Sequence, residues 1–201
     1  MSKYRFNHSS IYIEGTDIPH NKLNITTSED IHEAENILLE EAYSKLPKLI
    51  TKSVLNETYF INLHKKTFES LYDFAGVYRD VNMSKGDSQF CLAQYLHSES
   101  ARIFKELEDE NYLSDIKKKT LFAKRLAYYQ GELIALHPFY ELNGRVIRLF
   151  CDMLALKSGY RPIDYSGAID NGAYIEASIE CVQYADSSRL ERIVFEGLRE
   201  L

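Results

Sequence analysis

The chain has 201 residues, of which 45% are hydrophobic and 27% charged, and its formal net charge is −6. This length fits one domain, or one domain with an extension, that can bury a real core. The acidic balance argues against general nucleic-acid binding, which usually requires a basic face. No stretch is apolar over a membrane-spanning length and the N-terminus has no secretory apolar region, so a cytoplasmic protein is expected.

Three cysteines lie far apart in the chain: Cys91, Cys151 and Cys181. Their odd number and wide spacing indicate neither a zinc site nor a disulfide framework. They fit the reducing environment of the cytoplasm.

Residues 1–54 are expected to form an N-terminal extension, and residues 55–201 a core with C-terminal helices. In the extension, residues 9–15 indicate one or two helical turns that end at Gly15. From Thr27 to Asp30, acidic residues in a first turn predict the start of a helix, which apolar spacing carries to about Leu46.

Apolar residues at helical spacing predict further helices over about residues 56–74, 92–108, 113–136, 143–158, 170–184 and 187–199. Residues 77–90 differ in kind, because the turn at 85–88 lies between short extended segments; this predicts a small β-hairpin. The segment 143–158 is apolar nearly all round, which is typical of a helix in the middle of a bundle. The predicted fold class is therefore all-α, with one hairpin.

A short polar loop joins two of these helices within residues 137–148, His-Pro-Phe-Tyr-Glu-Leu-Asn-Gly-Arg-Val-Ile-Arg. Pro138 biases His137 away from the helical region, so His137 should lie at the end of the preceding helix. Asn143 can cap the following helix, and Gly144 allows its first turn to approach a ligand closely. The loop thus gathers polar groups between two helix ends.

These residue types suit chemistry on a phosphate group. A helix N-terminus is a ready anion site, and Arg145 and Arg148 can present two guanidinium groups from one helical face. Glu141 could hold a Mg²⁺ ion that bridges phosphate oxygens, and His137 could accept the proton of an attacking hydroxyl. Taken singly, the histidine could be a cap, the glutamate a solvated loop residue and the arginines surface residues. Together they favour a phosphate-handling site.

This stretch resembles the signature of the Fic family, His-Pro-Phe-x-Asp/Glu-Gly-Asn-Gly-Arg-x-x-Arg, at every defined position but one. Residues 71–79 are similar to the family's Tyr-x-Trp-Ala-Gly-x-x-Arg segment, with Phe74 in place of the tryptophan. Residues 82–90 resemble the family's flap hairpin. The resemblance covers roughly residues 55–185 and implies a Fic-type helical bundle with a small β-hairpin flap.

The resemblance implies Mg²⁺-dependent transfer of AMP from ATP to a Ser, Thr or Tyr hydroxyl of a target protein. His137 would be the general base and Glu141 the Mg²⁺ ligand. Residues 143–145 would hold the α- and β-phosphates, and Arg148 would reach the γ-phosphate. Relatives with lysine at the position of Gly144 transfer the γ-phosphate instead, so the glycine favours AMP transfer.

The flap of the family pairs with its target by strand addition. Lys85 and Phe90 are the flap residues expected to meet the target here, and Phe90 would pack on it. A homodimer is a further expectation, since relatives often dimerise. Nucleic acid and membranes are not expected partners.

Leu142 departs from the signature, which usually has glycine there. Leucine donates the same backbone N–H, but it takes a positive φ only with strain, and its side chain must be accommodated. Two alternatives therefore accompany AMP transfer. One is transfer of another phosphate-linked group, and the other is a non-catalytic interaction module disabled at Leu142.

Residues 10–15 match the family's inhibitory-helix pattern, Ser/Thr-x-x-x-Glu-Gly/Asn, through Ser10 and Glu14. In relatives this glutamate pairs with the second signature arginine, here Arg148. Glu14 would then inhibit the enzyme by taking the guanidinium that the γ-phosphate needs.

Glu196 is a C-terminal rival, because it precedes a glycine and some relatives carry this helix C-terminally. Arg192 stands where that version requires Ser or Thr. Glu14 is therefore the preferred inhibitory residue.

Overall fold

The computed structural model describes residues 5–6, 11–49 and 53–201. The helices of these residues confirm the all-α prediction. They are α1 (Ser28–Leu49), α2 (Glu57–Phe68), α3 (Leu96–Asp109), α4 (Lys119–Leu136), α5 (Asn143–Lys157), α6 (Ser166–Asp170), α7 (Ala173–Tyr184) and α8 (Ser188–Gly197). In the described part of the chain, no helix has both the length and the apolar character needed to cross a membrane.

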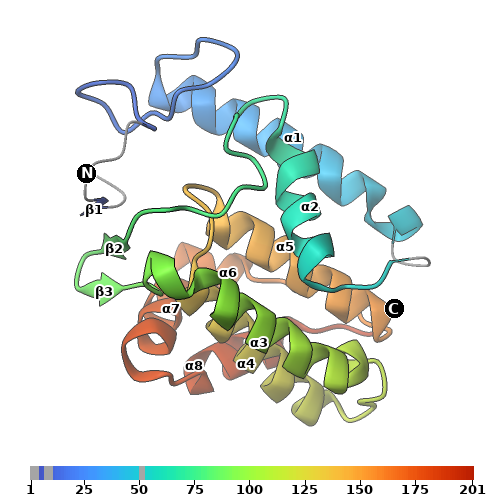
Figure 1. The fold of residues 1–201 in the computed structure, drawn as a ribbon. Coiled ribbons are helices and arrows are strands. Elements are labelled where there is room, and N and C mark those ends of the chain that lie inside the picture. The colour runs from blue at the N-terminus through green and yellow to red at the C-terminus, as the bar shows by residue number, and fades with distance from the viewer. Residues whose placement is uncertain (1–4, 7–10, 50–52) are drawn as a thin grey trace.

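The predicted hairpin is present, with shorter strands than expected. β2 (Met83–Lys85) and β3 (Ser88–Gln89) pair antiparallel around a turn in which Gly86 has φ +58°. A third strand, β1 (Arg5–Phe6), was not predicted and pairs antiparallel with β2 (Figure 1). The sheet order β1-β2-β3 means that the N-terminal strand covers the outer edge of β2.

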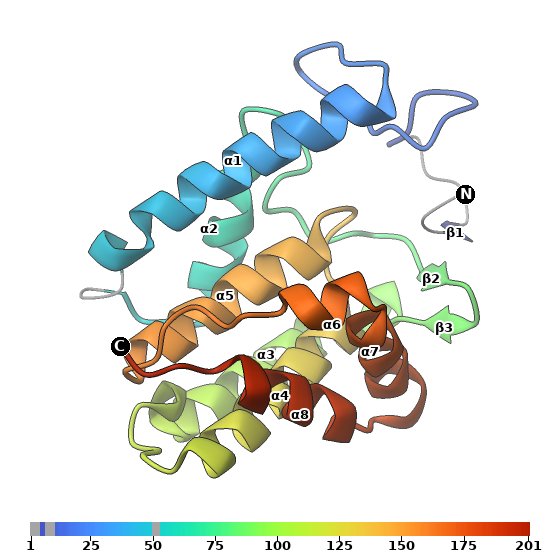
Figure 2. The same ribbon diagram turned by 180° about the vertical axis from the view of Figure 1, so that it is seen from behind.

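Helix α5 occupies the middle of the bundle, as its apolar sequence predicts. α1 and α2 lie on one side of it, and α4, α7 and α8 lie on the other (Figures 1 and 2). Phe60 of α2 packs against Phe104, Phe139 and Phe150, with ring centroids 5.6, 5.4 and 5.3 Å away. This aromatic contact joins α2, α3, α5 and the signature loop into one core.

A second hydrophobic cluster lies beside this core and joins the N-terminal segment and α1 to the signature loop. Its buried members are Ile18, Ile31, Phe68, Leu71, Tyr72, Ala75 and Leu142. Because Leu142 belongs to it, the position of the signature loop depends on packing against distant parts of the chain.

Three helix boundaries differ by four residues or more from the prediction, and α6 was not predicted. α2 ends at Phe68 rather than near residue 74, because Leu71 N–H and Tyr72 N–H return to the Phe68 carbonyl. α4 begins at Lys119 rather than 113, after residues 111–113, whose φ angles are positive. α3 begins at Leu96 rather than 92, after a 3₁₀ turn. Periodicity alone did not register these turns.

The helical turns expected at residues 9–15 are wrong where the structure describes them. Residues 11–20 instead fold back on themselves: Ile13 N–H donates to the Ile18 carbonyl (2.9 Å) and His20 N–H to the Ile11 carbonyl (2.7 Å). Gly15 has φ +75° in the turn, and Ile18 is buried in the second cluster. Burial of Ile18 explains why a reversed chain replaces a short helix, which is marginal by itself.

Candidate active site

His137 lies at the end of α4, as predicted. Its N–H still donates to the Leu133 carbonyl (3.0 Å), but its φ of +46° turns the chain out of the helix. Its Nδ1 lies 3.3 Å from the Ile134 carbonyl oxygen. Since a carbonyl only accepts hydrogen bonds, Nδ1 carries the proton and Nε2 carries the lone pair.

The imidazole of His137 is buried beneath the flap. The ring of Phe90 stacks on it with centroids 3.8 Å apart and planes 12° apart. Burial lowers the pKa of His137 to about 3; the hydrogen bond to Ile134 partly opposes this, and the charges of Arg79 and Lys85 add to it. The imidazole is therefore neutral at physiological pH, the form that accepts a proton.

Arg79 ties the end of α4 to both ends of the flap. It is almost fully buried, and its Nε donates to the His137 carbonyl (2.8 Å). Its other N–H groups donate to the carbonyls of Leu136 (3.2 Å), Val81 (2.7 Å) and Cys91 (2.5 Å). The segment 71–79 contains this arginine in the sequence comparison, but the sequence did not predict its role as the link between helix end and flap.

Glu141 is buried in the loop and already has a neighbour that sequence reasoning missed. The hydroxyl of Tyr12 donates to its Oε1 at 2.6 Å, so the N-terminal segment reaches the predicted Mg²⁺ ligand. No group of three or more His, Cys, Asp or Glu side chains in the described residues could hold a metal. One carboxylate suffices for Mg²⁺ only when substrate phosphates supply further oxygens, so Glu141 fits an ion that arrives with a nucleotide.

His64 of α2 holds the backbone of the same loop. Its Nδ1 accepts a hydrogen bond from Gly76 N–H (2.9 Å), so its Nε2 carries the proton and donates to the Glu141 carbonyl (3.1 Å). Burial lowers the pKa of His64 to about 4. A histidine on the buried face of a predicted helix was the available signal, but His64 was not among the predicted site residues.

Leu142 takes the strained conformation that its sequence position suggested, with φ +66° and ψ 12°. Its side chain is 6% exposed and packs in the second hydrophobic cluster with Ile18 and Ile31. Hydrophobic burial therefore offsets the cost of a left-handed leucine.

Asn143 does not cap α5, so that prediction is wrong. Leu142 occupies the N-cap position, and Asn143 is the first helical residue. The amide of Asn143 instead closes the loop from inside: its Oδ1 accepts from Phe139 N–H (2.9 Å) and its Nδ2 donates to the Phe139 carbonyl (2.7 Å). The groups at this end of α5 that could bind an anion are thus its backbone N–H groups rather than the Asn143 side chain.

The two signature arginines are partly exposed but lie toward different elements. Arg145 Nη1 donates to Glu35 of α1 at 2.8 Å. The guanidinium of Arg148 lies 5.3 Å from the ring centre of Tyr174 of α7. A Cβ at Gly144 would lie 3.7 Å from Arg148 Nη1, so Arg148 lies beside the first turn of α5. Two cations thus flank the helix N-terminus, where negative charge is stabilised.

Neither candidate inhibitory glutamate reaches this site in the described structure. Glu14 is exposed in the turn of residues 11–20, and Glu196 is exposed on α8. No ion pair joins either of them to Arg148 among the residues described. Ser10 lies outside the described residues.

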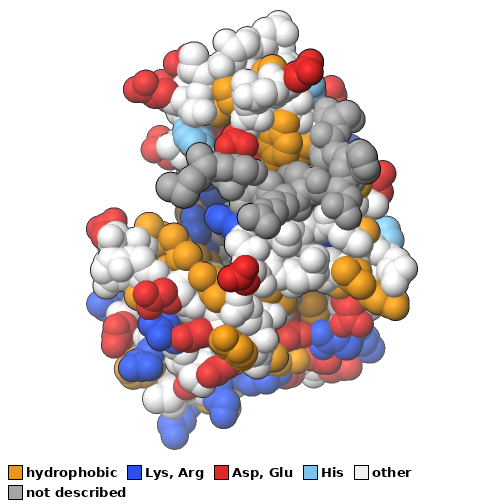
Figure 3. Space-filling view, turned by 90° about the vertical axis from the view of Figure 1, so that its left-hand side faces the viewer, with side chains coloured by type: hydrophobic (Ala, Val, Ile, Leu, Met, Phe, Trp, Pro, Cys, Tyr) orange, Lys and Arg blue, Asp and Glu red, His pale blue; other side chains and the backbone are white. Residues whose placement is uncertain are grey.

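The flap is held from two sides. The Ser88 hydroxyl of β3 accepts a hydrogen bond from Gln183 of α7 (3.2 Å), and β2 carries β1 on its outer edge. Lys85 is exposed at the end of β2, while Phe90 is buried against His137. Viewed from the flap side, Lys and Arg side chains line a recess between the N-terminal part above and the helices below (Figure 3).

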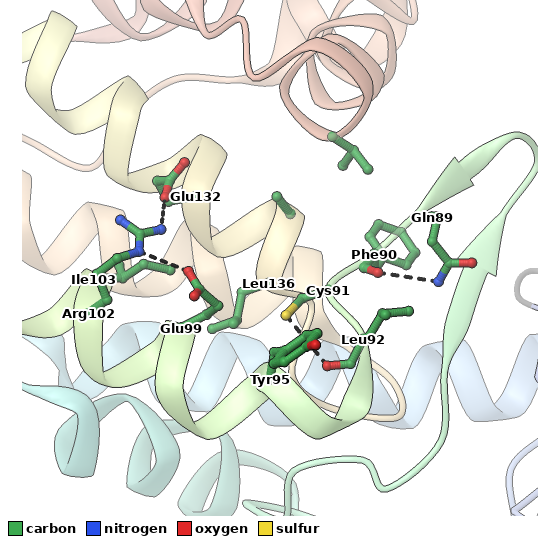
Figure 4. Close-up of a pocket in the computed structure, with 12 residues that line it drawn as sticks. Gln89, Phe90, Cys91, Leu92, Tyr95, Glu99, Arg102, Ile103, Glu132 and Leu136 are labelled. Atoms are coloured by element: carbon green, nitrogen blue, oxygen red, sulfur yellow. Dashed lines mark hydrogen bonds and ion pairs between the residues drawn. The ribbon is translucent and has the colours of Figure 1, made fainter.

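A separate cavity of about 430 Å³ lies between the flap, α3 and α4, and Phe90 is one of its lining residues (Figure 4). Its charged residues pair with one another, since Arg102 bonds to Glu99 (2.8 Å) and to Glu132. The one arginine among the described residues that line the cavity is therefore already paired with carboxylates.

These features define a helical domain in which a buried neutral histidine, a helix N-terminus and two arginines share one loop. A family model described as the Fic/DOC family matches residues 54–155, half of the chain. A protein of Escherichia coli K12 named "Probable protein adenylyltransferase Fic" is 32% identical over 149 residues, covering 73% of this chain and 72% of that protein. This chain belongs to the Fic/DOC family.

Further relatives agree with this assignment. "Probable protein adenylyltransferase y4lH" of Sinorhizobium fredii is 29% identical over 160 residues, or 80% of this chain and 82% of that protein. "Protein adenylyltransferase VbhT" of Bartonella schoenbuchensis is 29% identical over 200 residues, covering 100% of this chain and 41% of VbhT.

Solved structures share the fold. The BepC protein of Bartonella tribocorum, solved with bound AMPPNP, superposes with a TM-score of 0.80 at 22% identity over 95% of this chain and 97% of that chain. A Fic domain from Bartonella quintana, solved with bound ADP, has a TM-score of 0.81 at 20% identity over 94% of each chain.

Proposed function

We propose that this chain is a protein adenylyltransferase, which transfers AMP from ATP to a hydroxyl side chain of a target protein. The observation that carries the proposal is the buried neutral His137 beside the N-terminus of α5 and its two arginines. The names of the relatives and the nucleotides bound in the structural neighbours support the same chemistry.

In the proposed reaction the target hydroxyl oxygen attacks the α-phosphorus of ATP. A new P–O bond forms to the target, the bond from the α-phosphorus to the bridging oxygen breaks, and pyrophosphate leaves. The hydroxyl proton passes to Nε2 of His137, the ring nitrogen that carries the lone pair. The phosphate charge of a bound nucleotide raises the pKa of this imidazole from its low value, which improves it as a base.

The phosphates would be held by the backbone N–H groups at the start of α5 and by Arg145 and Arg148. Gly144 leaves room for the phosphates to approach the helix closely. Glu141 would hold the Mg²⁺ ion, which when bound neutralises phosphate charge. Because Tyr12 donates to the same carboxylate, the ion would compete with this hydrogen bond for Glu141.

The target segment is proposed to add to the flap as a strand. Since β1 occupies the outer edge of β2, a target strand at this edge would replace β1. Phe90, which stacks on His137, would then bring the target chain beside the catalytic imidazole.

Inhibition by Glu14 requires a rearrangement, because this residue lies in an exposed turn rather than in a helix facing Arg148. If such inhibition operates, residues 11–15 must leave the turn and the hydrogen bonds that close it must break. The Glu14→Gly variant tests this, and the described geometry favours activity equal to that of the wild type.

The test of the proposed function uses purified chain, Mg²⁺ and ATP labelled at the α-phosphate, with candidate target proteins present. Label should appear on protein with the wild type and disappear with His137→Ala. His20→Ala, at an exposed histidine outside the loop, is the matched control. Absence of α-label with both wild type and Glu14→Gly contradicts the proposal, whereas incorporation of γ-label would favour the phosphotransfer alternative.

A further inference from the structure

Glu35 of α1 is a buried carboxylate beside the signature loop. Its side chain is 5% exposed, and its two oxygens have separate partners. Oε2 accepts from Arg145 Nη1 at 2.8 Å, and Oε1 accepts from the Tyr72 hydroxyl at 2.6 Å. Glu35 also lines a cavity of about 200 Å³ together with Glu141, the expected Mg²⁺ ligand.

Such a carboxylate is costly to bury, so its pairing has to be complete. A buried carboxylate without partners either takes up a proton or destabilises the fold, whereas here each oxygen of Glu35 accepts from one donor. Burial and the neighbouring Glu35 raise the pKa of Tyr72, so this hydroxyl keeps its proton and remains a donor. Tyr72 therefore fixes the carboxylate from one side, and the carboxylate fixes the guanidinium on the other.

The contact with Glu35 orients Arg145 but uses only one of its guanidinium nitrogens. A guanidinium has five N–H donors, and Glu35 accepts from one nitrogen, Nη1. The Arg145 side chain remains 24% exposed, so its other donors can reach a ligand at the start of α5. A carboxylate that competed with a phosphate would need to be accessible, whereas the Glu35 side chain is only 5% exposed.

We propose that Glu35 is a positioning residue, which holds the Arg145 guanidinium in the orientation that binds the phosphates of a nucleoside triphosphate. This inference rests on the proposed function, because it takes the nucleotide as the ligand of Arg145. It assigns to α1, which lies outside the region matched by the family model, a part in the nucleotide site.

The first experiment measures ATP affinity by calorimetry in the presence of Mg²⁺. Glu35→Ala should weaken ATP binding at least about tenfold, because a misplaced binding group loses most of its contribution. Glu35→Gln keeps a hydrogen-bond acceptor without the charge, so its ATP affinity should lie between those of the wild type and Glu35→Ala. Tyr43→Phe is the matched control: it removes another hydrogen bond between α1 and α5, from Tyr43 to Asp152 (2.7 Å), and leaves the Glu35–Arg145 pair in place.

A double-mutant cycle asks whether Glu35 acts through Arg145. In an Arg145→Ala background, Glu35→Ala should cause no further loss of ATP affinity. Unchanged affinity in a folded Glu35→Ala single mutant, a gain in affinity, or a full loss that persists in the Arg145→Ala background would each overturn the inference. Failure of the wild type to bind any nucleotide would instead contradict the proposed function.

A second measurement needs no nucleotide. In ¹⁵N NMR spectra the Arg145 side-chain N–H groups should give hindered-rotation signals in the wild type and in Tyr43→Phe. They should average to freely rotating signals in Glu35→Ala. Equal guanidinium mobility in wild type and Glu35→Ala would overturn the positioning role even if the protein proved to bind no ATP.

Discussion

At position 142, glycine should give a more stable protein than alanine, the reverse of the usual order at a helical position. Truncating a buried leucine to alanine costs about 2–5 kcal/mol through lost burial and the cavity left behind. Leu142→Ala keeps a Cβ at φ +66°, where a non-glycine residue is strained by about 1–2 kcal/mol. Leu142→Gly removes that strain, but the extra conformational entropy of glycine in the unfolded chain destabilises the fold by about 0.4–1 kcal/mol. Leu142→Gly should therefore be more stable than Leu142→Ala by about 0.5–1 kcal/mol.

The matched control is Leu38, which packs against the same cluster from the interior of α1. At a helical position glycine is about 1 kcal/mol less favourable than alanine, so the order of the two variants should reverse. Urea unfolding followed by circular dichroism measures all four variants, provided that the m-values agree. Leu142→Ala proving as stable as Leu142→Gly, or more so, would refute the claim that strain at this position is offset by packing.

The same variants address function. Leu142→Gly keeps the backbone N–H of the loop, so nucleotide binding should change by less than about threefold when compared at a temperature where the variant is folded. If the chain is instead a module disabled at Leu142, this substitution should create α-label transfer that the wild type lacks. Labelling assays on wild type and Leu142→Gly in parallel separate the two interpretations.

Four further predictions follow from buried groups and from β1. The pKa of His64 falls to about 4 in the fold, so its contribution of about 3 kcal/mol is present above pH 6.5 and lost toward pH 4; His64→Gln should flatten that acid limb in urea titrations. Burial raises the pKa of Asp152 to about 6, so its own contribution to stability should fall by about 3 kcal/mol as the pH rises from 4 to 6, opposite in sign to that of His64, and Asp152→Asn should remove this contribution. Arg79→Lys should cost about 3 kcal/mol, since one ammonium cannot replace the donors to four carbonyls; an unchanged urea midpoint would contradict this. Replacing Arg5 and Phe6 with proline removes the backbone donors of β1 and should raise target labelling several-fold, whereas equal labelling would argue against strand exchange at this edge.

The sequence by itself determined the elements with local causes. Continuous apolar residues determined α5, turn residues around Gly86 determined the flap, and the His137-Pro138 step determined where α4 ends. Helical periodicity and the conformational limits of glycine and proline act over only a few residues. A short stretch of sequence is therefore enough to predict these elements. The same holds for the suspicion that Leu142 would be strained.

Tertiary structure decided the partners of the signature residues. Asn143 turned inward to Phe139 rather than capping α5, and residues 11–15 formed a turn rather than an inhibitory helix. Arg145 is paired with Glu35, 110 residues away in sequence, and Glu141 with Tyr12, 129 residues away. Glu35 stands between Ile31 and Leu38 on the buried stripe of α1, and a charge at that place was the one available signal. Which donor such a charge meets depends on how helices pack across the core, and no local spacing encodes that packing.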